Sequence, residues 1–444
     1  MIGVRSYLDF LASNANLAAF GFVTALASSF GQTFFIGVFS PQIQSEFELS
    51  RTAWSTIYLL GTLASAFVLP WTGRQIDRLP LATYATAVWA LLAIACIAFS
   101  LAPGPVGLVF GIFLLRQAGQ GLMSHVAVTT MARFFAAARG RAIAIASLGF
   151  AVGEAGLPFL AVFANDALGW RWTYRIGAVL LLAGVGPALL LLRRARASMN
   201  TTQDSENKTD NVLALRERAA TQTPAASQST QSPPPIAASR DTQTQPRSWT
   251  RAEVARDKRF YCLLPGLLCP SLVITAMFFH HLNVADLKGW SHQWVTGSYI
   301  VFAIFSTITS LVAGALIDRF GAIRIVPIML LPQAVGLLFI VFFDHPLAVL
   351  PYLALIGVTT GIGHTAVAAL WAELYGVAHI GAIRSLAASL SVFGSALGPV
   401  TMGGFMDLGT SAEQVCLVFA FFCLIGTALI TLAVSGTIAA QRPI

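Results

Sequence analysis

Two charged side chains fall deep inside long apolar stretches. Arg116 lies within the stretch 106–130, and Glu154 lies within 139–163. A helix rises about 1.5 Å per residue, so both would sit on the order of 15–20 Å below a membrane surface. A charge at that depth is costly and by default indicates a functional site. We expect Arg116 to bind an anionic group and Glu154 to exchange a proton, with the two side chains paired or facing one water-filled cavity. The alternative is a buried ion pair that only fixes helix packing, although such pairs are poor stabilisers.

Other polar side chains on apolar stretches are candidates for lining the same cavity. The expected substrate contacts besides Arg116 are Gln32, Tyr58, Gln120, His281 and His364, and further lining candidates are His125, Asn283 and Trp371. His280 is expected to be a second proton acceptor beside Glu154, because imidazole titrates near neutral pH. Neighbouring helical residues point about 100° apart, so only one of the two adjacent histidines should face the cavity. For each single residue, simple packing is the alternative.

The composition places these residues in a membrane protein. Of 444 residues, 56% are hydrophobic and 10% are charged, whereas soluble domains carry about 25% charged residues. The mean hydropathy is +0.73. Long apolar runs separated by short charged breaks predict an all-α polytopic protein with twelve transmembrane helices. The predicted helices cover 15–40, 52–71, 82–102, 106–130, 139–163, 172–192, 261–283, 293–317, 323–343, 347–371, 381–405 and 413–436.

One central segment differs from everything around it. Residues 193–259 are rich in Ser, Thr, Gln, Pro and charge, and such a composition buries too little apolar surface to fold. We therefore predict an N-terminal six-helix bundle at 1–192, a disordered cytoplasmic linker at 193–259 and a C-terminal six-helix bundle at 260–444. The run WTRAEVARDKRF at the end of the linker is a candidate for a short interfacial helix.

The positive charges predict how the chain is oriented. The net charge is +8, and most Lys and Arg residues fall in alternate loops together with the linker. Only Arg51, Arg171, Arg175 and Lys288 belong to the other set of loops. By the positive-inside rule both termini are cytoplasmic, and we expect a multi-pass protein of the inner (plasma) membrane. This distribution accounts for the basic charge without nucleic-acid binding.

Short motifs recur at equivalent places in the two halves. The pattern G-x-x-x-D-R spans 73–78 after the second predicted helix and 314–319 after the eighth. A carboxylate there can meet the N-terminus of a neighbouring helix, and a guanidinium can bind a carboxylate. We expect Asp77, Arg78, Asp318 and Arg319 to form latches that break and re-form. Glycines also recur, at 149, 153 and 156 and at 394, 398 and 403, and predict flat, flexible helix faces at a moving interface.

These motifs carry a family resemblance. Over its whole length the chain resembles the major facilitator superfamily of transporters. The G-x-x-x-D-R loops resemble the family's loop motif, the run RQAGQG at 116–121 resembles its arginine motif, and 139–163 resembles its glycine–proline motif, with Glu154 where a Pro is usual. Phe134 through Gly149, with GWRW at 169–172, is similar to the monocarboxylate and oxalate:formate branch. The resemblance implies two pseudo-symmetric bundles that rock about a central site.

Several classes of function receive no support from the sequence. There is no G-x-x-x-x-G-K-[ST] loop for ATP and no nucleophile–base constellation, so we do not expect an enzyme. The histidines lack metal-ligand spacing, and the five cysteines lie in apolar helices, which suits reduced packing residues; we expect neither a metal nor a cofactor.

The sequence therefore predicts a secondary active transporter for a small organic anion such as a monocarboxylate, with protons as coupling or exchange partners. Two alternatives stay open. Proton-driven efflux of amphipathic compounds is favoured by the glycine-rich stretch 139–163 and by the uncharged stretch 293–317. A non-transporting membrane sensor would use the central linker as its output.

Overall fold

The computed structural model describes residues 4–135, 138–220 and 248–440. Twelve helices within these residues are long and apolar enough to cross a membrane, which confirms the predicted fold class. The first six spans contain α1 (Val4–Ala27), α2 (Thr33–Ile36) and α3 (Ser40–Glu46), then α4 (Arg51–Gly73), α5 (Leu81–Ser100), α6 (Pro105–Leu115) with α7 (Ser124–Phe134), α8 (Arg139–Leu168) and α9 (Trp170–Ala220).

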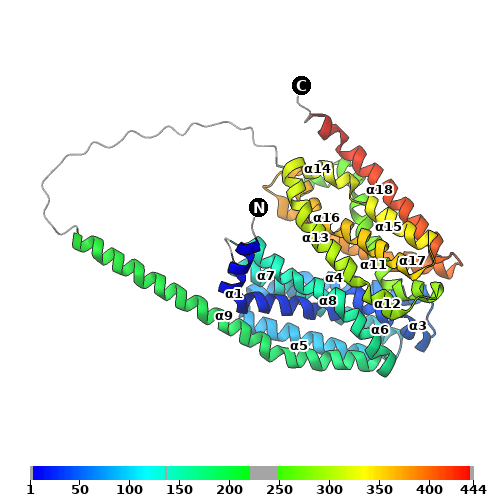
Figure 1. The fold of residues 1–444 in the computed structure, drawn as a ribbon, viewed down its shortest axis with the longest axis horizontal. Coiled ribbons are helices and arrows are strands. Elements are labelled where there is room, and N and C mark those ends of the chain that lie inside the picture. Colours follow the sequence, from blue (N-terminus) through cyan, green and yellow to red (C-terminus); the bar gives the residue numbers. More distant parts are fainter. Residues whose placement is uncertain (1–3, 136–137, 221–247, 441–444) are drawn as a thin grey trace.

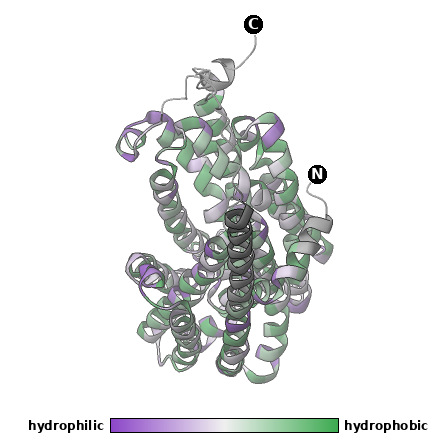
Figure 2. Cartoon of the chain, turned by 90° about the vertical axis from the view of Figure 1, so that its left-hand side faces the viewer, coloured by the Kyte–Doolittle hydropathy of each residue, from purple (hydrophilic) through white to green (hydrophobic). Residues whose placement is uncertain are grey.

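The remaining six spans follow a short helix, α10 (Arg251–Val254). They contain α11 (Lys258–Lys288), α12 (His292–Gly297) with α13 (Tyr299–Phe320), α14 (Ala322–Ile325) with α15 (Leu331–Phe342), α16 (Val349–Tyr375), α17 (Ile380–Asp407) and α18 (Ala412–Ala440). Hydrophobic residues run along the helices, and hydrophilic residues gather at helix ends and loops (Figure 2).

The spans form two bundles that touch along a few helices (Figure 1). Within the first half α1 packs on α8 and α5 on α9, and within the second half α11 packs on α17 and α13 on α16. The main contacts between the halves are α4 with α17 and α8 with α13. If the first six spans are superposed in order on the last six, α4 corresponds to α13 and α8 to α17. The superposition therefore maps the contact of α4 with α17 onto the contact of α13 with α8, as a pseudo-twofold axis requires.

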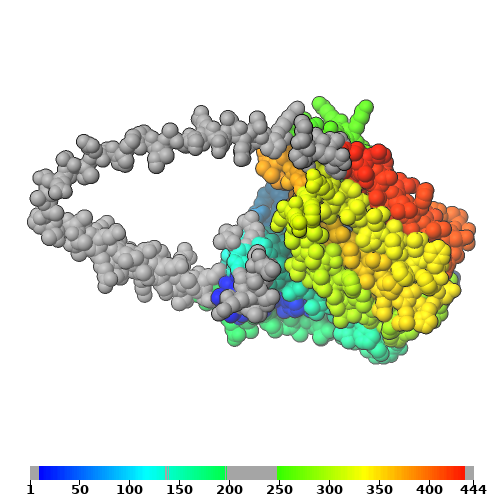
Figure 3. All heavy atoms as spheres, turned by 45° about the horizontal axis from the view of Figure 1, so that its top comes forward, coloured from blue at the N-terminus to red at the C-terminus, as the bar shows by residue number. Residues whose placement is uncertain are grey.

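Both chain ends lie at one end of the bundle, which we call the terminal end (Figure 1). The opposite end, which we call the distal end, carries the connections after residues 46, 100, 168, 288, 342 and 407. Figure 3 views the molecule with the second half, in yellow to red, in front of the first half.

The first span is broken, whereas the sequence predicts one continuous helix over 15–40. Helix α1 ends at Ala27, a tighter turn covers Ser28–Gly31, and Gln32 is extended at φ −86° and ψ 153° before α2 begins. Gly31 faces Gly119 of the fourth span so closely that a Cβ on Gly119 would lie 2.6 Å from the Gly31 Cα. Around that crossing, Arg116–Met123 is π-helical. Two glycines allow this backbone-to-backbone approach, and the helices deform on both sides of it.

The ends of the predicted linker are helical. Helix α9 continues to Ala220, so the predicted disorder fails at the start of the linker. At its end α10 covers Arg251–Val254, within the run predicted as a candidate short helix, whose interfacial position stays a prediction. Extending an existing helix needs no new nucleus, so a polar chain can continue it at little cost. α10 begins with a capping box between Thr250 and Glu253. Residues 221–247 lie outside the described residues, and the domain boundaries themselves remain a prediction.

The glycine faces of α8 and α17 pack mostly inside their own halves. Gly149 and Gly153 lie against α1, and Gly398 lies against α11. The moving interface predicted for these glycines therefore applies to Gly403, which lies against Arg51 and Ser55 of the other half. Close packing of helices within a bundle needs small residues as much as a sliding interface does.

Two glycines of α8 give a matched test of this packing. A methyl group at Gly149 would collide with the Phe22 carbonyl oxygen, whereas one at Gly156 meets no heavy atom within 4 Å. We expect Gly149→Ala to lower the free energy of unfolding by about 1–3 kcal/mol through overpacking. Gly156→Ala should be neutral or stabilising, since Ala favours helix. Thermal unfolding of the purified variants measures both, and equal midpoints would contradict the packing described here.

Candidate functional site

Arg116 is buried within the first half, behind the break in the first span. Its side chain is 2% exposed. Nη1 donates to the Gly31 carbonyl at 3.2 Å and to Thr33 Oγ1 at 3.3 Å. The guanidinium lies 5.3 Å from the centre of the Tyr58 ring, and the Tyr58 hydroxyl hydrogen-bonds to Thr33 at 2.5 Å. Arg116 lies in the fourth span. It therefore joins the broken first span to Tyr58 on α4, which is the second span.

The charge on Arg116 is balanced by dipoles and not by a carboxylate. Gly31 ends a helical turn, where unpaired carbonyls carry partial negative charge. The Tyr58 ring contributes its electron-rich face. No described carboxylate forms an ion pair with Arg116, and its buried Nε has no hydrogen-bond partner. This guanidinium thus keeps unused capacity for an anion.

Glu154 lies elsewhere, on the face of α8 that looks toward the second half. It forms no ion pair with Arg116, although both side chains are described, so pairing, one of the two predicted arrangements, is wrong, and a shared cavity stays a prediction. The reason lies in the glycine face: Gly153 packs on Ser29, and the next residue points about 100° away from that contact. Glu154 is partly buried and makes no hydrogen bond with another described residue. Tyr299 of α13 lies within electrostatic range of it.

His280 joins three helices at the contact between the halves. Its Nε2 lies 3.0 Å from Ser55 Oγ of α4 and 2.9 Å from the Pro399 carbonyl of α17. Ser55 donates its own hydrogen to the Arg51 carbonyl. Both neighbours of Nε2 are therefore acceptors, and Nε2 carries the hydrogen. Nδ1 lies 3.5 Å from Asn283 Oδ1.

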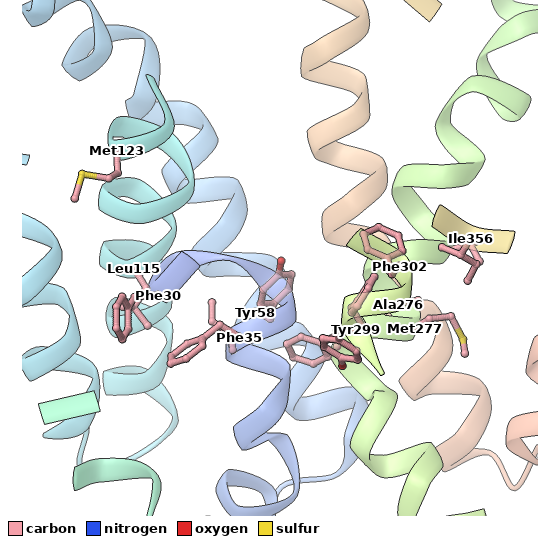
Figure 4. Packing of buried hydrophobic residues seen from close by; sticks show 14 of the residues in the cluster. Phe30, Phe35, Tyr58, Leu115, Met123, Ala276, Met277, Tyr299, Phe302 and Ile356 are labelled. Atoms are coloured by element: carbon pink, nitrogen blue, oxygen red, sulfur yellow. The ribbon is translucent and has the colours of Figure 1, made fainter. Parts of the chain in front are cut away.

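That only one of the two histidines faces a cavity stays a prediction, since neither lines the cavity described below. His281 points into its own half. Its Nδ1 lies 3.1 Å from the Tyr299 hydroxyl, and the two rings stack at 5.4 Å. Its Nε2 is buried without a partner. Figure 4 shows Phe35 and Tyr58 of the first half together with Tyr299 of the second half.

A cavity of about 690 Å³ opens between the halves toward the terminal end. Its walls come from α4, the π-helical segment and α7 on one side and from α17 on the other. The polar lining residues are Thr62, Ser65, Arg74, Asp77, Gln120, Ser124, His125 and Ser389. Of the predicted substrate contacts, Gln120 lines this cavity. Arg116 stands one turn beyond Gln120, and Tyr58 is buried beside it.

The other predicted contacts lie outside that lining. Gln32 occupies the extended break of the first span and is partly buried, and His364 is exposed on α16. His125, which the sequence indicated as a further lining candidate, does line the cavity, and so does Ser65, which the sequence did not indicate. The sequence does not indicate which face of an apolar helix a small polar residue occupies, so Ser65 could not be predicted to line the cavity.

The distal end is closed by hydrogen bonds between the halves. Asn283 donates to Gln44 at 3.3 Å, and Gln293 donates to Asp166 at 2.7 Å. Ser40 donates to the Phe279 carbonyl at 3.1 Å. The structure therefore pairs a closed distal end with a cavity at the terminal end, as expected for one state of an alternating-access protein.

The predicted latch residues lie at the terminal end and remain within their own halves. Asp77 pairs with Arg133, which also donates to the Ile76 carbonyl. Arg78 and Asp318 are exposed, and the Arg319 guanidinium lies over the Phe320 ring. In the second half the equivalent contact is made by Glu373, which accepts from the backbone N–H groups of Ala322 and Ile323 at 2.6 and 3.0 Å. A latch role for Asp77, Arg78, Asp318 and Arg319 is still a prediction.

Two six-helix bundles around a one-sided cavity define a membrane transporter. The sequence matches the family model described as Major Facilitator Superfamily over residues 21–399 and 293–441. The chain belongs to this superfamily, whose members are transporters and not enzymes.

Solved structures support the same fold. The nucleoside transporter NupG is 12% identical, with a TM-score of 0.63 over 97% of this chain and 100% of that chain. A bacterial homolog to the human lysosomal transporter Spinster, in an inward-facing and occupied conformation, is 15% identical, with a TM-score of 0.62 over 100% of both chains. Its unoccupied form has a TM-score of 0.58 at 14% identity, over 99% of this chain and 100% of that one. No curated protein sequence matches the chain significantly.

Cysteine labelling tests the one-sided cavity. With the native cysteines replaced, Ser389→Cys on α17 and Ala66→Cys on α4 should react with a membrane-impermeant maleimide added from the side of the termini. Ala276→Cys, which is fully buried, is the control and should not react. Reaction of the two cavity positions only from the distal side would contradict the arrangement.

Proposed function

We propose that this protein is a secondary active transporter that moves a small organic anion, such as a monocarboxylate, in exchange for or together with protons. The observation that carries the proposal is the buried guanidinium of Arg116, which has no carboxylate partner and an unused Nε. A substrate carboxylate could take the place of the Gly31 carbonyl and Thr33 as its partner. Such a bond would be charge-assisted and therefore stronger than the present ones.

The path to Arg116 supports this assignment. Gln120 lines the cavity and stands one turn from Arg116 in the same π-helical segment. Tyr58 and Thr33, which cover the guanidinium, hydrogen-bond to each other. Thr33 directly follows the break in the first span. A small shift of α2 and Tyr58 would open Arg116 to the cavity.

Glu154 and His280 are proposed as the proton sites. Each lies where the halves meet: Glu154 on α8 opposite α13, and His280 between α4 and α17. When the halves rock, these contacts separate and the surroundings of both groups change from dry to wet. The affinity of each group for a proton then depends on conformation, which is the requirement for coupling.

The terminal end is proposed to face the cytoplasm. The loops at that end hold most of the Lys and Arg residues outside the central segment. The cavity would then be open to the cytoplasm, as in the Spinster homolog described as inward-facing. This orientation is tested by comparing two observations: the side of the membrane from which Ser389→Cys is labelled, and the side on which a tag attached to one terminus is accessible.

A second candidate is proton-driven efflux of amphipathic compounds. It is favoured by the apolar part of the cavity wall, formed by Ala66, Leu69, Pro70 and Val392. This candidate needs no guanidinium, so the two functions differ in their dependence on Arg116.

Replacing Arg116 separates the two candidates. Charge-assisted hydrogen bonds contribute about 1.5–3 kcal/mol, so Arg116→Met should lower uptake of labelled acetate, lactate, pyruvate or oxalate into proteoliposomes by about tenfold or more. Arg116→Lys, which keeps the charge, should retain more activity. Because Met leaves the Gly31 carbonyl without its donor, thermal stability should fall by about 1–3 kcal/mol, and uptake is compared per amount of folded protein. Undiminished carboxylate uptake by a folded Arg116→Met protein contradicts anion binding there.

Replacing Glu154 tests proton coupling. An imposed pH gradient should accelerate uptake by the wild-type protein, and Glu154→Gln should abolish that response because the amide cannot exchange a proton. Glu48→Gln, on an exposed turn at the distal end, is the matched control and should respond like the wild type. A pH response that survives in Glu154→Gln removes the residue from the coupling mechanism.

A further inference from the structure

Asp407, the last residue of α17, binds the first turn of α4 across the contact between the halves. Oδ2 accepts a hydrogen bond from the Thr52 backbone N–H at 2.7 Å. Oδ1 accepts one from the Arg51 backbone N–H at 3.3 Å, and the Arg51 guanidinium lies 3.8 Å away. Arg51 and Thr52 are the first two residues of α4. A carboxylate from one half therefore caps a helix of the other.

The local structure of α4 leaves these two N–H groups available. The first N–H groups of any helix lack partners within the helix and carry partial positive charge. Ser50 caps α4 within its own half and accepts from the third residue, Ala53. Arg51 and Thr52 are left for Asp407. A carboxylate is the strongest acceptor for such groups, and part of its strength comes from the helix dipole.

The backbone of α17 approaches α4 one turn before Asp407. A Cβ at Gly403 would lie 2.9 Å from the Arg51 carbonyl oxygen and 3.0 Å from Ser55 Oγ. Gly403 therefore allows the two helices to touch, and the side chain four residues later reaches the start of α4. His280 binds Ser55 and the Pro399 carbonyl one turn deeper along the same pair of helices.

We propose that Asp407 is the gate residue of the distal end, and that its cap on α4 sets how often that end opens. Opening requires α4 and α17 to separate at the distal end. The two backbone N–H groups and the Asp407 carboxylate must then form hydrogen bonds to water instead of to each other.

Among the described residues, other distal ion pairs lie inside one half: Asp344 and Glu413 bind Lys288 in the second, and Glu46 binds Arg171 in the first. The hydrogen bond from Gln293 to Asp166 also joins the halves, but it does not cap a helix. The proposal rests on the membership of the transporter superfamily and not on the roles of Arg116 or Glu154, so failure of those tests leaves it standing.

Spin labels at the two ends of the molecule test the gate. In the full chain with the native cysteines replaced, Val106→Cys and Leu347→Cys report across the distal end, and Leu79→Cys and Val377→Cys report across the terminal end; all four side chains are exposed. Double electron–electron resonance then measures the distribution of distances within each pair of spin labels in lipid nanodiscs. Asp407→Ala should lower the ratio of closed to open distal ends by about tenfold, the effect of losing one charge-assisted contact. The terminal distance should shorten in the same samples.

Asp344→Ala is the matched control, since it removes a distal carboxylate that acts within one half, and its distributions should match those of the parent. If Asp407→Ala does not fold, Asp407→Asn keeps an acceptor oxygen without the charge and should give a smaller shift in the same direction. Unchanged distal distributions in the folded Asp407 variant, or an equal shift in Asp344→Ala, overturn the proposal.

Discussion

Every backbone N–H and C=O inside a bilayer needs a partner within the protein, and this constraint governs the centre of the structure. The first span breaks at Gln32, which leaves the Gly31 carbonyl without its helical partner. Arg116 supplies the missing hydrogen bond, together with one to Thr33. The guanidinium and the broken helix therefore depend on each other. The free Gly31 carbonyl stabilises the buried charge of Arg116, and the guanidinium satisfies the carbonyl that the break leaves without a helical partner.

The contacts between the halves are both apolar and polar. Trp54 and Tyr58 of the first half pack on Phe279 of the second. Polar groups at helix ends and at small residues also meet across the halves, such as Ser55 with His280 and Asp407 with the start of α4. Exchanging one of the polar bonds for water costs about 0.5–1.5 kcal/mol, and about 1.5–3 kcal/mol where the carboxylate of Asp407 is a partner. An interface of this kind is specific and still reversible.

Much of the architecture was predictable from the sequence, because membrane spans are set by length and hydropathy alone. The twelve predicted stretches coincide with the twelve spans to within a few residues at most ends. The first span is the exception, since its break depends on the approach of Gly31 to Gly119, two residues far apart in the chain. The helical extension of α9 to Ala220 was missed because composition describes average behaviour and takes no account of a helix already formed upstream.

The candidate site was predictable only in part. That Arg116, Glu154 and His280 are unusual followed from their residue types at that depth in apolar stretches, because hydrocarbon penalises any polar group wherever it points. Their directions did not follow. The rotation of α8 about its axis is decided by Gly149 and Gly153 against α1, and it turns Glu154 away from Arg116. By itself the sequence determined the number of spans, the two-bundle plan and the depth of the polar residues. Only the tertiary structure decided which side chains share a partner, because that depends on helix rotation and on contacts between residues distant in the chain.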